Sequence, residues 1–144
     1  MKILIPPSEG KSSKNTTSIK FKDTNSKFED AINHLIIKLS EYKPLEIQKI
    51  YGVTNEKSVK LHEQNLNLFE SECSPAIERY TGVVYNNLNP ESLDQKANNF
   101  LEENFLITSA LLGLVSPSDL IPLYKLKMNI LRLHDYWNPL FTEH

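Results

Sequence analysis

The residues best suited to chemistry lie in a polar loop directly after the first apolar run of the chain. Ser8 and Lys11 stand in the sequence Ser8-Glu9-Gly10-Lys11-Ser12-Ser13. A loop that leaves a strand end can direct backbone N–H groups and an ammonium at phosphate. Gly-Lys-Ser also ends a Walker A loop, but Ile5 occupies the position of that motif's first glycine. The loop therefore predicts an anion site that is not a Walker A site.

A catalytic interpretation of the same loop is also open. Ser8 and Lys11 match S-x-x-K, a pattern in which a lysine activates a serine nucleophile. The partner motifs S-D-N and K-T-G are absent from the sequence, so an ordinary loop is the favoured interpretation of that match. The alternative function is an enzyme that acts on a phosphate-bearing or nucleobase substrate at this loop.

Metal and thiol chemistry have little support. Cys73 is the single cysteine, which excludes an intrachain disulfide and a Cys-based zinc site. Glu70 and Glu72 flank it and disfavour a reactive thiolate. Direct iron sequestration is a third hypothesis, but no metal-binding spacing connects the histidines, and we expect no metal or cofactor. The histidines are His34, His62, His134 and His144.

Composition gives a weak electrostatic signal. The 144 residues carry a net charge of −2, so no global field draws the chain to nucleic acid. Residues 1–27, however, hold six lysines against Glu9 and Asp23, a net charge of +4, and residues 28–144 are acidic. This distribution favours a local anion site, with a solvated lysine-rich loop as the alternative. Residues 14–27 read as an exposed excursion, and Lys14 begins it.

The length predicts one domain over residues 1–144. No apolar run approaches the roughly 20 residues that cross a bilayer, and Pro6 and Pro7 interrupt any signal peptide. We therefore expect a cytoplasmic protein without a membrane partner. The oligomeric state is not predicted.

Three segments predict strands. Residues 1–5 and 105–108 are short apolar runs, typical of buried strands. Residues 123–128 alternate, with Lys125 and Lys127 on the solvent side and Leu126 and Met128 on the other. If the first strand lies beside the later apolar segment, Lys11, Lys125 and Lys127 share one anion-attracting hollow.

Helices are predicted between these strands. Ser26 and Glu29 fit a capping box before an apolar stripe that Pro44 ends. Further helices are expected over 45–51 with Gly52 as their stop, over 54–69, from Ser74-Pro75, and from Asn89-Pro90. Within these helices Val59 and Phe100 are expected to face the core. The fold class is therefore α/β (α+β), a central mixed sheet covered by helices.

Several motifs follow one another along the chain. They are Ile3-Leu4-Ile5-Pro6-Pro7-Ser8-Glu9-Gly10-Lys11, Pro75-Ala76 with Tyr80-Thr81-Gly82-Val83-Val84-Tyr85, Ser109-Ala110-Leu111-Leu112-Gly113-Leu114 with Pro117, Asp119-Leu120-Ile121-Pro122, Tyr124-Lys125-Leu126-Lys127-Met128, and Tyr136-Trp137. In this order they resemble the YaaA family of bacterial peroxide-stress proteins. The resemblance covers residues 1–144 but only the first part of a typical member, so a C-terminal truncation is expected.

The resemblance implies a YaaA-like fold and a non-enzymatic protein that binds DNA in the response to hydrogen peroxide and limits iron-driven damage. It also implies a helix-hairpin-helix element beside a positively charged cleft. Here the best match is the helix from Ser74 with the turn at Thr81-Gly82-Val83, and a plain helix-turn is the alternative. The residues expected to bind the DNA backbone, without sequence specificity, are Ser8, Lys11, Lys14, Thr81, Gly82, Lys125 and Lys127.

Overall fold

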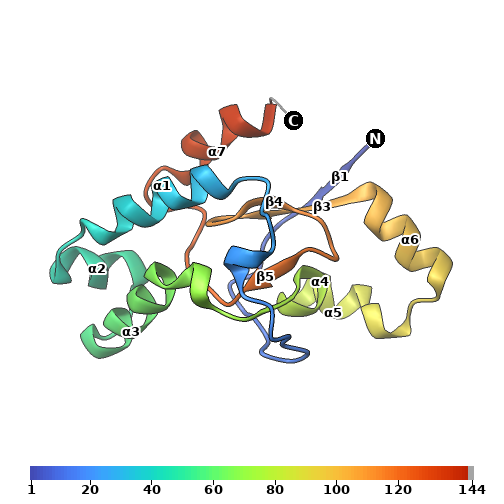
Figure 1. Ribbon diagram of the computed structural model, residues 1–144, viewed down its shortest axis with the longest axis horizontal. Coiled ribbons are helices and arrows are strands. Elements are labelled where there is room, and N and C mark those ends of the chain that lie inside the picture. The colour runs from blue at the N-terminus through green and yellow to red at the C-terminus, as the bar shows by residue number, and fades with distance from the viewer. Residues whose placement is uncertain (143–144) are drawn as a thin grey trace.

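The computed structural model describes residues 1–142 and has two small β-sheets among helices (Figure 1). In the first sheet, β1 (Ile3–Ile5) runs parallel to β3 (Phe105–Ser109), which pairs antiparallel with β4 (Gly113–Val115). In the second, β2 (Cys73–Pro75) pairs antiparallel with β5 (Leu120–Pro122). The predicted α/β class, with a mixed sheet, is confirmed.

The helices lie around these sheets. α2 and α3 lie together at one end of the long axis, α6 lies at the other, and α1 and α7 run close to each other beside β4 (Figure 1). The α-helices are α1 (Glu29–Ser40), α2 (Pro44–Tyr51), α3 (Asn55–Leu66), α4 (Ala76–Arg79), α5 (Val83–Leu88), α6 (Gln95–Asn104) and α7 (Leu133–Thr142), and short 3₁₀ turns occupy Phe21–Asp23, Leu68–Glu70 and Pro90–Ser92.

The core between α1, α7 and β4 requires a glycine. Gly113 has φ +83°, and a Cβ atom there would lie 2.9 Å from the Phe28 ring and 3.0 Å from the Trp137 ring. The indole N–H of Trp137 donates to the Ala110 carbonyl oxygen over 2.7 Å, so this buried aromatic has a polar partner. These contacts fix α7, and with it one wall of the cleft described below.

The predicted first strand forms, but its burial was wrong. β1 is an edge strand, and the side chains of Ile3 and Leu4 are 37% and 58% exposed. β3 pairs with one edge of β1, and of the three residues of the strand Ile5 is buried in the core. β3 is confirmed as a strand, although only Ile107 and Ser109 are fully buried, so it is not covered on both faces.

The predicted strand over residues 123–128 was wrong. The alternation itself is present, because Tyr124 and Leu126 are buried and Lys127 is exposed. However, the backbone of this segment binds a side chain instead of a neighbouring strand. Lys125 N–H donates to Asn65 Oδ1 over 3.0 Å, and Asn65 Nδ2 donates to the Lys125 carbonyl oxygen over 2.8 Å. A periodicity of two thus identified the buried face but not the pairing partner.

Several helix predictions also needed correction. The Ser26–Glu29 capping box does not form: α1 begins at Glu29, whose N–H donates to the Ser26 carbonyl oxygen over 3.2 Å. The residue before the helix is Phe28, which is held in the aromatic core beside Trp137. α1 ends at Ser40, ahead of Pro44, which instead opens α2.

The prediction for α2 is confirmed, since Gly52 ends this helix with φ +63°. In α3 the expected core residue Val59 is exposed, and the buried positions are the polar Ser58, His62 and Asn65. In α6, Phe100 is 57% exposed rather than buried. Asp94, and not Asn89, caps α6 through a hydrogen bond of 2.8 Å from Ala97 N–H.

Candidate functional site

The Ser8–Ser12 loop packs against the turn between α4 and α5. Lys11 and Tyr80 form an isolated antiparallel bridge, Ser12 N–H donates to the Arg79 carbonyl oxygen over 2.7 Å, and Thr81 N–H donates to the Gly10 carbonyl oxygen over 3.0 Å. Two motifs that are about 70 positions apart in the sequence therefore form one structural unit.

Glycines make this close packing feasible. A Cβ atom on Gly10 would lie 2.6 Å from Thr81 Oγ1, which is too close for any real contact. Gly82 has φ +112°, a conformation that side chains other than glycine rarely adopt, and its Cβ would meet Ser8 Oγ at 3.2 Å. Thr81 and Gly82, predicted as phosphate-binding residues, thus lie against Gly10 and Ser8.

Arg79 is a buried anchor for the loop. It is only 1% exposed, and its guanidinium donates to the carbonyl oxygens of Ser12 (2.8 Å), Ile121 (3.2 Å) and Glu72 (3.3 Å). Burial lowers the pKa of this guanidinium. Arg79 joins the loop to β5 and to the start of β2, so its role is positional. No residue pattern predicts this role, because all three acceptors are backbone carbonyl oxygens.

Lys11 points back over its own loop onto two tyrosine rings. Its Nζ donates to the Ser8 carbonyl oxygen over 3.1 Å and lies 4.1 Å from the Tyr124 ring centroid and 5.5 Å from that of Tyr80. Burial, and then the nearby Lys125, lower the pKa of Lys11 from 10.5 to about 8; Glu9 opposes this shift and Arg79 adds to it. The ammonium form of Lys11 therefore predominates at neutral pH, and a substantial fraction of the amine is neutral near pH 8.

This geometry does not form the serine–lysine pair that S-x-x-K suggested. The Lys11 amine binds the Ser8 carbonyl oxygen, and in the part of the chain that the structure describes it makes no hydrogen bond to the Ser8 hydroxyl. Activation of Ser8 by Lys11 is therefore absent from this conformation.

The hydroxyl groups of these tyrosines take part in a buried hydrogen-bond network. The Tyr124 hydroxyl lies 2.8 Å from that of Tyr80 and 2.7 Å from Ser109 Oγ, which accepts from Leu112 N–H. The Tyr85 hydroxyl donates to the Pro6 carbonyl oxygen over 2.7 Å. Burial raises the pKa of the tyrosines, so these hydroxyl groups stay protonated. Sequence reasoning did not assign this hydroxyl network a role.

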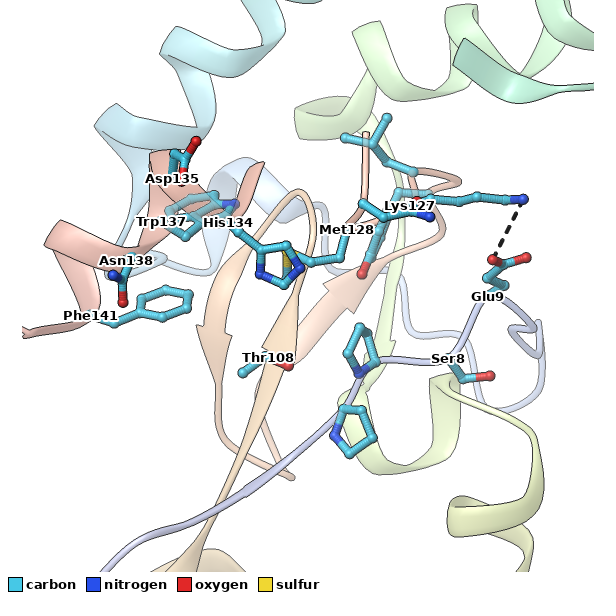
Figure 2. Close-up of a pocket in the computed structure, with 15 residues that line it drawn as sticks. Ser8, Glu9, Thr108, Lys127, Met128, His134, Asp135, Trp137, Asn138 and Phe141 are labelled. Atoms are coloured by element: carbon cyan, nitrogen blue, oxygen red, sulfur yellow. Dashed lines mark ion pairs between the residues drawn. The ribbon is translucent and has the colours of Figure 1, made fainter. Parts of the chain in front are cut away.

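Glu9 joins the loop to the other predicted lysines. Its carboxylate lies 4.0 Å from Lys125 Nζ and 3.7 Å from Lys127 Nζ, and Figure 2 shows the Glu9–Lys127 pair at the rim of a cleft. Lys11 is also close enough to Lys125 for their charges to interact. The structure thus brings Lys11, Lys125 and Lys127 together, as predicted from the hypothesis of a shared hollow.

Lys14 lies apart from this cluster. It is exposed, and its carbonyl oxygen accepts a hydrogen bond from Ser74 Oγ over 3.1 Å. Its ammonium has no contact with the other predicted lysines within the described chain. The structure therefore separates Lys14 from the group to which the sequence assigned it.

A cleft of about 740 Å³ opens beside the lysine cluster. In Figure 2, His134, Trp137, Asn138 and Phe141 of α7 form one wall, and the segment with Ser8 and Glu9 lies opposite. Thr108 and Met128 lie between these walls. Tyr124, whose ring contacts the Lys11 amine, also lines the cleft. The cleft and the lysine cluster therefore share a border.

The segment proposed as a helix-hairpin-helix differs from the prediction. Ser74 does not open a helix, because it pairs with Ile121 in the β2–β5 ladder. α4 has four residues and α5 has six, joined by a turn that contains Gly82. The segment consists of two short helices joined by a turn. Its assignment as a DNA-binding hairpin stays a prediction.

The thiol and the histidines do not assemble into a reactive centre. Cys73 is fully buried, and burial raises the pKa of its thiol to about 11 against a weaker opposing effect of Arg79. No group of three or more His, Cys, Asp or Glu side chains that could hold a metal occurs in residues 1–142. His144 lies outside the described residues. Among the described helices, none is long and apolar enough to cross a membrane.

Comparison with known proteins identifies the family. The family model described as "Peroxide stress protein YaaA" matches residues 1–144. The chain belongs to this family. An uncharacterized protein of Campylobacter jejuni is 33% identical over 133 residues, which cover 88% of this chain and 53% of that relative. A UPF0246 protein of Rickettsia conorii is 31% identical over 116 residues, or 78% of this chain and 47% of the relative.

A UPF0246 protein of Francisella philomiragia is 28% identical over 153 residues, which cover 99% of this chain and 60% of the relative. The resemblance inferred from motifs along the sequence is therefore confirmed. The chain spans about half the length of the curated relatives it matches.

Proposed function

We propose that this chain binds the phosphate backbone of DNA, without sequence specificity, as a non-enzymatic part of the cellular response to hydrogen peroxide. Membership of the peroxide stress family supports the biological context. The observation that carries the molecular proposal is the convergence of Lys11, Lys125 and Lys127, from the two ends of the sequence, around the Ser8–Lys11 loop.

The electrostatics of the cluster suit an exchangeable anion. Three ammonium groups face one carboxylate, so the local charge is positive. The Lys125 and Lys127 side chains are 35% and 45% exposed, and ion pairs at such sites contribute little stability. A phosphate can therefore replace the Glu9 carboxylate at small cost. The Gly10 and Gly82 backbone, which packs tightly against Ser8 and Thr81, offers a rigid border for this exchange.

The family is also expected to limit iron-driven damage. We assign this chain's part in that process to DNA binding, which would limit the damage by protecting the DNA.

A salt titration tests the binding proposal. Binding of a fluorescently labelled duplex is measured by anisotropy at several salt concentrations, for the wild type and for the double variant Lys125→Ala, Lys127→Ala. Loss of two phosphate contacts is expected to lower the slope of log K against log [salt] by about 2. The control is Lys38→Ala, Lys49→Ala, which removes two exposed lysines from α1 and α2. A flat salt dependence of the wild type would exclude phosphate-driven binding.

The second candidate function is an enzyme at the Ser8–Lys11 loop, with a phosphate-bearing or nucleobase substrate. The observation that favours it is the unusual environment of the Lys11 amine, since amines of lowered pKa in a site are frequent catalytic groups. Under this hypothesis Lys11→Ala abolishes turnover and leaves the melting temperature nearly unchanged. Under the binding hypothesis the same substitution only weakens affinity.

A further inference from the structure

The Lys11 amine has the surroundings of a nucleophile. Its Nζ lies against the faces of the Tyr124 and Tyr80 rings, and its hydrogen-bond acceptors are backbone carbonyl oxygens. Its neighbour Glu9 directs its carboxylate to Lys125 and Lys127. The amine therefore has no hydrogen-bonded carboxylate among the described residues, and a second cation lies nearby. Partial desolvation and an adjacent cation are the two conditions that activate lysine toward carbonyl compounds.

The position of this amine is fixed by its loop. Ser12 N–H donates to the Arg79 carbonyl oxygen and the Gly10 carbonyl oxygen accepts from Thr81 N–H, so the loop is held on both sides of Lys11. Gly10 packs on Thr81 without room for a side chain. The amine is thereby held at the Tyr124 ring, which also lines the 740 Å³ cleft. Lys127 also lines the cleft, so a ligand phosphate at Lys127 lies on the same border as the Tyr124 ring, against which the Lys11 amine packs.

We propose that Lys11 forms an imine with an aldehyde that carries a neighbouring phosphate. Two sources share this chemistry: the open-chain sugar of an abasic site in DNA, and a free phosphorylated aldehyde. The inference rests on the proposed phosphate site, because Lys125 and Lys127 hold the phosphate while Lys11 reacts. It extends that site from binding to covalent capture, a chemistry suited to DNA that has lost a base.

The reaction is balanced without an added oxidant or reductant. The lone pair of the neutral Lys11 amine attacks the carbonyl carbon, a C–N bond forms, and the carbonyl oxygen takes up a proton to give a carbinolamine. This intermediate loses water as the nitrogen releases its remaining proton, and a C=N bond forms. The net change is one water released for each imine. Ser8 has no part as nucleophile, in keeping with the absence of a Lys11–Ser8 hydroxyl contact in the described structure.

Reductive trapping tests the proposal. The 144-residue chain is incubated with sodium cyanoborohydride and either a duplex that contains an abasic site or free pyridoxal 5′-phosphate. The reductant converts an imine to a stable secondary amine, which mass spectrometry of peptides assigns to a residue. We expect the adduct on Lys11, with a yield that rises as the pH approaches 8 because the neutral amine becomes more abundant. The intact duplex is the control substrate.

Two variants separate chemistry from binding. Lys11→Arg keeps the charge but cannot form this imine, so it should lose the adduct, and its affinity for intact duplex is measured in parallel. Lys11→Met is the second variant if Lys11→Arg does not fold, which circular dichroism reveals. The matched control Lys14→Ala removes an exposed lysine just after the loop and should keep the adduct.

The outcomes are distinct. An adduct on Lys11 with the abasic duplex supports the DNA source, and one with pyridoxal 5′-phosphate alone supports a free aldehyde. An adduct with the free aldehyde but no affinity for intact duplex would refute the proposed DNA binding while leaving the Lys11 chemistry intact. No adduct in either arm, or an unchanged adduct in Lys11→Arg, would overturn the inference.

Discussion

At the residue scale, Lys11 links stability to pH. Its pKa falls from 10.5 to about 8 on folding, mainly because burial disfavours its charge. Below about pH 8 the amine is charged in both states, so folding bears the full cost of the buried charge. Between about pH 8 and 10.5 the unfolded chain binds more protons than the folded chain does. The free energy of unfolding therefore rises with pH in this interval.

Lys11→Met removes this titration and predicts a pH-dependent difference. The free energy of unfolding of the wild type, relative to Lys11→Met, is expected to increase from about pH 8 to pH 10. Urea denaturation at several pH values measures the difference, in which the titrations of other groups cancel. Lys14→Met, which replaces an exposed lysine close by in the sequence with the same residue, is the matched control. A difference that stays constant with pH would contradict the prediction.

At the element scale, α3 positions the lysine segment through a buried amide. Asn65 is fully buried, and its side chain binds both the N–H and the carbonyl of Lys125 and the hydroxyl of Tyr51. This interaction takes the place that a neighbouring strand would occupy. It sets the position of Lys125, and with it the charge that faces Lys11.

Asn65→Ala should therefore destabilise the protein and disturb the lysine cluster. Buried polar groups of Lys125 and Tyr51 would lose their partner, at a cost of about 2–4 kcal/mol in the free energy of unfolding. Chemical denaturation measures this cost, and the duplex titration shows whether affinity falls with it. The matched control is Asn67→Ala just after the same helix, where the amide is exposed, and a change within about 0.5 kcal/mol is expected. Equal effects of the two substitutions would refute the positioning role.

At the scale of the whole molecule, the edge of the first sheet exposes apolar side chains. Figure 1 shows β1 projecting beyond the helices, and Leu4 is exposed there although it pairs with Leu106 of β3. Edge strands usually carry charges, prolines or cover that prevent pairing with another chain. Pro6 and Pro7 provide this protection only after the strand, and Lys2 only before it.

We predict that this edge causes concentration-dependent association, and that Leu4→Lys reduces it. A charge on an edge strand opposes intermolecular pairing, while an exposed position costs little stability. Light scattering over a range of protein concentrations measures association. Leu45→Lys is the matched control, since it places the same charge at an exposed leucine of α2, away from the sheet. If both variants reduce association equally, general solubility and not the β1 edge is the cause.

The sequence alone determined the local features of this protein. Gly52 predicted the end of α2, the apolar run predicted β3, and alternation identified the buried side of residues 123–128. The ordered motifs predicted the family, which the comparison confirms. These signals succeed because turn chemistry and hydrophobic periodicity depend on residues a few positions apart.

The tertiary structure alone decided how the site is built. Arg79, Asn65 and the Tyr80–Tyr124 pair hold the lysines through contacts across 40 or more positions of sequence, mostly with backbone groups. Every residue type has the same backbone carbonyl group, so a hydrogen bond to that group cannot be predicted from the sequence. The pKa of Lys11 was equally hidden, because it arises from burial and from Lys125, more than 100 positions away. Turns and hydrophobic periodicity can thus be predicted from neighbouring residues, whereas the desolvation of a side chain and its long-range partners arise only once the chain has folded.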